Sequence, residues 1–123
     1  MSSTGKVTVN LPIQKLNTTT ENIITIANSM PDLTRKVYYC GSGALSCGCP
    51  ENHCVVYIDR GSSNRCVMNC YAISSKRHYI NSSVDVIDKP LKSENWKDLT
   101  KVSFPYGPDL PENPKVGDFF FKI

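Results

Sequence analysis

The six cysteines of this 123-residue chain all lie between residues 40 and 70, and no other residue type offers as much chemistry in so short a segment. Thiols can pair as disulfides, ligate a soft metal ion or act as nucleophiles. An even, clustered set in a small chain is typical of a disulfide framework in an oxidising compartment. The sequence therefore predicts three bridges among Cys40, Cys47, Cys49, Cys54, Cys66 and Cys70.

The spacing restricts the pairing of these cysteines only slightly. Cys66 and Cys70 are four residues apart on a predicted strand, so they share a face but lie about 13 Å apart, too far for a mutual bridge. Cys47 and Cys49 are also poor mutual partners. We expect Cys40, Cys47, Cys49 or Cys54 to pair with the two thiols of the strand, with one further bridge inside the loop; the exact connectivity stays open.

Zinc is the main alternative use of the thiols. Cys47, Cys49, His53, Cys54, Cys66, Cys70 and His78 supply enough soft ligands for a tetrahedral site. Structural zinc sites commonly pair thiols two to four residues apart on a turn, and only Cys66 and Cys70 have such a spacing, on a predicted strand. Our first hypothesis therefore has no metal and no cofactor, and an intracellular zinc-binding interaction domain is the alternative.

A candidate binding surface lies on the turn between two predicted strands, residues 55–58 and 66–73. Glycine, serine and asparagine in residues 59–65 favour a hairpin turn. We expect its polar, basic tip to project into solvent, with Arg60, Gly61, Asn64 and Arg65 as the binding residues. A rigid, bridged loop loses little entropy on docking, and arginine is common in interface hot spots. This predicts a non-enzymatic protein-binding module, such as an effector, immune modulator or inhibitor.

A further alternative is a small ribonuclease-like hydrolase. His53 and His78 could act with Glu51, Glu94 or Glu112 as a general acid and base. Two histidines are a common count for a chain of this size, and the favoured explanation is one solvent-exposed histidine in a loop and one at a strand edge. No catalytic residue is assigned, and the chain is expected to be a binding protein rather than an enzyme.

The predicted fold is α+β, with a mostly antiparallel sheet of five to seven short strands in a single domain over residues 1–123. Apolar residues alternate in residues 6–11, and strands are expected at 35–40, 55–58, 66–73, 79–80, 84–87 and 102–104. Residues 118–123 contain three consecutive phenylalanines and predict a buried closing strand.

Two helices are predicted. Thr18 with Glu21 has the form of a capping box, and apolar residues then recur at helical spacing up to Pro31, so an amphipathic helix is expected near residues 19–30. Ser93 can cap a short helix near residues 94–100 that carries the only tryptophan, Trp96.

Composition excludes several classes of protein. The hydrophobic fraction of 40% and the charged fraction of 20% are those of a globular chain rather than a disordered one. The net charge of +3 is scattered along the chain, which gives no strong signal for nucleic acid. No apolar run is long enough to span a membrane. Oligomeric state is not predicted.

Localisation rests on the cysteines. The first residues show no signal peptide, which leaves either a cytoplasmic protein or a secreted one whose signal is absent from the sequence as given. The clustered thiols favour secretion and an extracellular protein partner. Two glycosylation sequons, at Asn17 and Asn81, are compatible with it.

Overall fold

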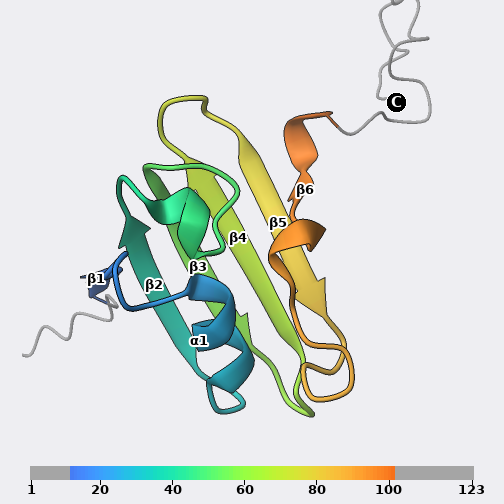
Figure 1. Cartoon of the computed structure of the whole chain (residues 1–123). Helices are drawn as coiled ribbons and strands as arrows, with labels where there is room; N and C mark the ends of the chain where they lie inside the picture. The colour runs from blue at the N-terminus through green and yellow to red at the C-terminus, as the bar shows by residue number, and fades with distance from the viewer. Residues whose placement is uncertain (1–11, 102–123) are drawn as a thin grey trace, which may run out of the picture.

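In the computed structural model, which describes residues 12–101, one six-stranded sheet carries a single α-helix on one face (Figure 1). The strands follow one another across the sheet in chain order: β1 (Ile13–Lys15), β2 (Arg35–Cys40), β3 (Cys54–Arg60), β4 (Cys66–Ala72), β5 (His78–Ser83) and β6 (Lys97–Asp98). Only β1 and β2 are parallel. The predicted mostly antiparallel α+β sheet is confirmed for this part of the chain, whereas the single domain over residues 1–123 stays a prediction.

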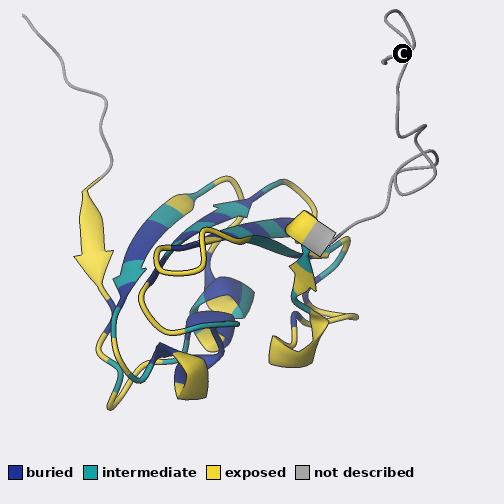
Figure 2. Cartoon of the chain, turned by 90° about the horizontal axis from the view of Figure 1, so that it is seen from above, coloured by how far each residue is buried: buried dark blue, intermediate teal, exposed yellow. Residues whose placement is uncertain are grey.

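The central strands alternate between a buried and a half-exposed face. In β3 every second residue, Cys54, Val56, Ile58 and Arg60, is buried. The even-numbered residues of β4 are buried in the same way. Because side chains of a strand alternate across the sheet, these residues point to one face, which α1 (Ile23–Ser29) and short 3-10 helices cover (Figure 2).

Helix α1 begins later than the capping box predicts. Its N-cap is Asn22, whose side-chain oxygen accepts hydrogen bonds from the backbone nitrogens of Ile24 at 2.9 Å and Thr25 at 3.2 Å. Glu21 instead closes a preceding turn by accepting a hydrogen bond from the backbone nitrogen of Asn17. The prediction of one amphipathic helix in this region is confirmed, but Thr18 is not its cap.

Two other local predictions are wrong. The short helix near residues 94–100 is instead two 3-10 helices, η2 (Ser93–Asn95) and η3 (Leu99–Lys101), on either side of β6. Residues 84–87 form turns rather than a strand, although Val86 is buried there. The predicted strands at residues 6–11, 102–104 and 118–123 lie outside the described residues.

Candidate functional site

Four of the six cysteines lie together on the helix-bearing face of the sheet, near the end of β2 and the start of β3. The register places Cys40 directly opposite Cys54, and Cys70 opposite Val56, so that Cys70 is the diagonal neighbour of Cys54 on the same face. Cys49 reaches them from the loop after η1 (Ala44–Cys47). The sulfur atoms of Cys40, Cys49 and Cys54 all lie within 4.8 Å of one another, and all three residues are buried.

Cys54 is the centre of this thiol cluster, by which we mean Cys40, Cys49, Cys54 and Cys70. Hydrogen bonds from Cys40, Cys49 and Cys70 lower the pKa of Cys54. The same bonds raise the pKa of the donors: contacts with Cys40 and Cys54 raise that of Cys49, and the contact with Cys54 raises that of Cys70. The thiol of Cys54 also donates to the backbone oxygen of Glu51 at 3.4 Å.

The loop that delivers Cys49 depends on a glycine. Gly48 has φ +96°, and a Cβ there would lie 2.8 Å from Cγ1 of Ile24 and 3.0 Å from the capping oxygen of Asn22. Its carbonyl accepts a hydrogen bond of 2.7 Å from the indole nitrogen of Trp96. Only glycine combines this backbone conformation with so close an approach to the helix.

The remaining two cysteines, Cys47 and Cys66, are also buried. The thiol of Cys47 donates to the backbone oxygen of Thr18 at 3.1 Å. Burial raises the pKa of Cys66 to about 11, and its charged neighbours are Arg60 and Asp59. All six cysteines are free thiols in this structure, so disulfide stabilisation stays a prediction.

Arg60 lies inside the protein and not at an exposed tip, so the expectation that it projects into solvent is wrong. Its guanidinium donates to the backbone oxygens of Ala27 and Met30 and pairs with Asp32 at 3.1 Å. The residue is only 6% exposed. A cation at the C-terminus of α1 satisfies carbonyls that the helix leaves free and complements its dipole. Arg60 therefore fastens the helix to the sheet.

The other predicted binding residues do lie on the turn between β3 and β4. Gly61 and Arg65 are joined by a backbone hydrogen bond of 2.8 Å. Asn64 adopts φ +64° and donates its backbone nitrogen to the carboxylate of Asp32 at 3.2 Å. The side chain of Arg65 is exposed and contacts only the carbonyl of Ser62 among the described residues. This leaves Arg65 as the accessible cation of the turn.

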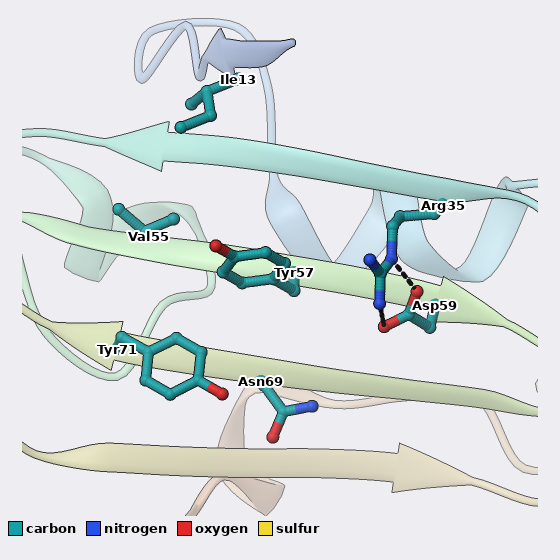
Figure 3. Close-up of a pocket in the computed structure, with 7 residues that line it drawn as sticks. All are labelled: Ile13, Arg35, Val55, Tyr57, Asp59, Asn69 and Tyr71. Atoms are coloured by element: carbon teal, nitrogen blue, oxygen red, sulfur yellow. Dashed lines mark hydrogen bonds and ion pairs between the residues drawn. The ribbon is translucent and has the colours of Figure 1, made fainter. Parts of the chain in front are cut away.

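The opposite face of the sheet is not covered by any helix of the described chain (Figure 2). A shallow hollow of about 620 Å³ lies on it (Figure 3), and its lining residues are Ile13, Arg35, Val55, Tyr57, Asp59, Asn69 and Tyr71. We call this surface the open face. A second hollow of about 350 Å³ shares Asp59 with the first and includes Gly61 and Arg65, so the turn continues the open face.

Aromatic rings form a connected row on the open face. Tyr57 and Tyr71 meet edge to face with centroids 5.7 Å apart, and His78 stacks on Tyr71 at 4.5 Å. Arg35 lies 5.9 Å above the ring of Tyr57. Tyr57 and Tyr71 both have odd numbers in strands whose even-numbered residues are buried, and this is the signal in the sequence that they share the other face.

Charge on the open face is largely balanced. Arg35 pairs with Asp59 through two hydrogen bonds, of 2.5 and 3.2 Å (Figure 3). The hydrogen bond with Asp59 raises the pKa of Arg35. The pair places one positive and one negative group side by side, so this part of the surface attracts neither polyanions nor polycations strongly.

Among residues 12–101, neither histidine is hydrogen-bonded to Glu51 or Glu94, the described carboxylates of the hydrolase alternative. Nε2 of His78 lies 2.8 Å from the side-chain oxygen of Asn69, an amide rather than a carboxylate. Glu51 accepts from Tyr79 at 2.6 Å, and Tyr79 neighbours His78 in β5, so their side chains point to opposite faces. His53 lies 3.5 Å from the hydroxyl of Tyr39. Glu112 is outside the described residues.

Comparison with known proteins adds no relative. No family model, curated protein or solved structure matches the chain. Among residues 12–101, no helix is long and apolar enough to cross a membrane. The function must therefore be argued from the thiol cluster and the open face.

Proposed function

We propose that the protein is a non-enzymatic protein-binding module and that it recognises its partner through the open face. The observation that carries this proposal is the row formed by Tyr57, Tyr71 and His78 beside an apolar hollow on an uncovered sheet. Tyrosine supplies a large contact area at low entropic cost and is enriched at interfaces.

A protein surface fits the open face better than a nucleic acid does. Ile13 is 59% exposed and Tyr71 is 44% exposed, so apolar and aromatic area lies open to solvent. Arg35 is already paired with Asp59, which leaves Arg65 as the free cation identified at the edge of this surface. Affinity for a phosphate backbone needs several unpaired cations along one groove, whereas a protein interface needs an apolar centre with polar groups around it.

The binding residues expected from the sequence enter this proposal in part. Gly61 and Arg65 extend the open face, and Asn64 shapes the turn through its bond with Asp32. Arg60 supports the surface from beneath rather than touching the partner. The proposed site is therefore centred on the strands, with the turn at its edge.

Secretion and an extracellular partner remain part of the hypothesis rather than of the description. One of the two glycosylation sequons no longer supports secretion. Asn81 lies in β5 and is only 2% exposed, so the folded chain would shield it from glycosylation. Asn17 is exposed. The oxidation state of the thiols decides between secretion and the cytoplasmic alternative.

A displayed library of random peptides can test the open face without a known partner. We expect the protein to select peptides whose affinity falls at least about tenfold with Tyr71→Ser, because an interface loses about 1.4 kcal/mol or more when a central aromatic is removed. Leu45→Ser is the matched control: Leu45 is also exposed, at 59%, but belongs to η1 on the helix-bearing side.

Two results would overturn the proposal. One is a library that yields no peptide, or peptides equally sensitive to both substitutions. The other is tight binding of single-stranded oligonucleotides that depends on Tyr71 and His78, since stacked rings on a sheet can also receive bases.

A further inference from the structure

We propose that Cys40, Cys49, Cys54 and Cys70 form a buried tetrathiolate site for Zn²⁺. Nothing in the binding role of the open face requires such a site, and the cluster lies on the other face of the sheet. The zinc alternative considered from the sequence drew its ligands from Cys47, Cys49, His53, Cys54, Cys66, Cys70 and His78. The structure brings together three of these, Cys49, Cys54 and Cys70. Cys40, which that alternative did not include, is the fourth member of the set.

The first argument is convergence. Three sulfur atoms lie within 4.8 Å of one another, and the sheet register places Cys70 diagonally beside Cys54 on the same buried face. Ligands of a tetrahedral zinc ion with Zn–S bonds of about 2.3 Å are about 3.8 Å apart, so small movements of these side chains would enclose the ion. A disulfide joins two sulfurs and gives no reason for a third to approach both.

The second argument comes from where the ligands are attached. Cys40, Cys54 and Cys70 are fixed by three adjacent strands, and their register is set by the ladder. Cys49 comes from the loop after η1. Gly48 permits the conformation of this loop, and the indole of Trp96 donates a hydrogen bond to the carbonyl of Gly48. Three ligands on a rigid sheet and one on a loop form a closed, water-free shell, as structural zinc sites require.

The third argument is the position of the two remaining thiols. Cys47 bonds to a backbone carbonyl, and the neighbours of Cys66 are charged side chains of β3 rather than another sulfur. If two bridges formed within the thiol cluster, a third would have to join these two, which have different neighbours in the structure. A set of four converging thiols with two others outside it matches a metal site better than a disulfide framework.

Binding exchanges protons for the ion. Each thiol that becomes a ligand releases one proton to solvent as its Zn–S bond forms, and no electron is transferred. Four thiolates and Zn²⁺ leave a site with two negative charges.

The test is metal content and thiol count on the protein purified without chelator. We expect about one zinc ion per chain and six alkylatable thiols once the protein is denatured with a chelator present. Substitution of Co²⁺ should give the visible spectrum of a tetrahedral thiolate complex. Cys70→Ser should weaken metal binding at least about tenfold, because a serine hydroxyl is a poor zinc ligand.

Cys66→Ser is the matched control, since Cys66 is buried on the same face of β4. It should keep its zinc. In case Cys70→Ser does not fold, the unsubstituted protein supplies a second readout: a chelator should lower its melting temperature, and added zinc should restore it.

Several outcomes would overturn the proposal. A metal-free protein whose mass is lower by four hydrogens would show two disulfide bridges instead of a metal site. Six free thiols with no affinity for Zn²⁺ or Co²⁺ would also refute it, as would equal loss of zinc in Cys66→Ser and Cys70→Ser. None of these results bears on peptide binding at the open face, which fails or succeeds by its own test.

Discussion

Arg60 is the residue whose role changes most between sequence and structure. Its position after Asp59 and before Gly61 suggests an exposed turn, yet its guanidinium binds two carbonyls at the end of α1 and the carboxylate of Asp32. In β3 every second side chain is buried, and Arg60 follows Val56 and Ile58 in this pattern, which explains its burial. Because β3 ends two residues later than predicted, a residue expected on the surface becomes a core residue.

Arg60→Ala should therefore destabilise the protein strongly. Removal of the guanidinium leaves the carbonyls of Ala27 and Met30 buried without this donor and Asp32 without its cation. We expect the free energy of unfolding to fall by about 3 kcal/mol, measured by urea denaturation.

Arg65→Ala is the control for this measurement. Arg65 is exposed on the same turn, and its removal should change stability by no more than about 0.5 kcal/mol. Equal effects of the two substitutions would show that Arg60 does not fasten the helix.

At the scale of elements, the sequence predicted the strands well and their ends poorly. β2, β3 and β4 follow from period-two patterns, and the turn between β3 and β4 follows from its glycine and asparagine. The start of α1 was missed because Thr18 and Glu21 match a capping box in sequence, while Asn22 makes the actual cap. Thr18 and Asn22 are both residue types that cap helices well. The helix begins after Asn22 because Ile23 and Ile24 pack into the core.

The cap offers a direct test. Asn22→Ala should cost about 1 kcal/mol of stability, because the backbone nitrogens of Ile24 and Thr25 lose their acceptor. Thr18→Ala, at the position expected from the sequence, should cost clearly less. Chemical denaturation of the two variants compares them, and a larger loss for Thr18→Ala would place the cap where the sequence suggested.

Gly48 connects the loop of Cys49 to the first turn of α1, and its substitution tests that connection. Gly48→Ala should lower stability by about 1 to 3 kcal/mol, since the new methyl group meets Ile24 at 2.8 Å in a backbone conformation that alanine disfavours. Thermal unfolding measures the loss.

Gly41→Ala is the comparison for the loop. Its Cβ would meet only the ring of Tyr39, at 3.5 Å, which is an ordinary contact. A small effect there with a large one at Gly48 would show that the close approach to the helix, and not loss of a loop glycine in general, is responsible.

For the whole molecule, the candidate sites divide between the two faces of one sheet. Period-two alternation assigns the even-numbered cysteines of β3 and β4 to the helix-bearing face and Tyr57 and Tyr71 to the open face, so this division was readable in the sequence. The thiol cluster was not, because it depends on the register that sets Cys40 against Cys54 and on the loop that folds Cys49 back over them. Contacts between segments far apart in the chain carry no local signal.

Burial of thiols also makes the stability of the whole molecule depend on pH. The pKa of Cys66 is raised to about 11 in the folded protein from its ordinary value of 9.0, chiefly because burial disfavours the thiolate. Below pH 9 the thiol is protonated in the folded and in the unfolded protein, so it does not change the free energy of unfolding. Between pH 9 and about 11 the unfolded chain loses this proton first, so the free energy of unfolding should fall, by about 2 to 3 kcal/mol from this one group.

Cys66→Ala isolates that contribution. Urea denaturation at a series of pH values should show the unsubstituted protein losing stability between pH 9 and 11 more steeply than the variant, with the difference between them constant below pH 9. Cys66 lies apart from the thiol cluster, so this difference should be the same with and without bound metal. Parallel curves for the two proteins across this range would mean that the thiol of Cys66 reaches solvent, and the packing of β4 against the helix-bearing side would need revision.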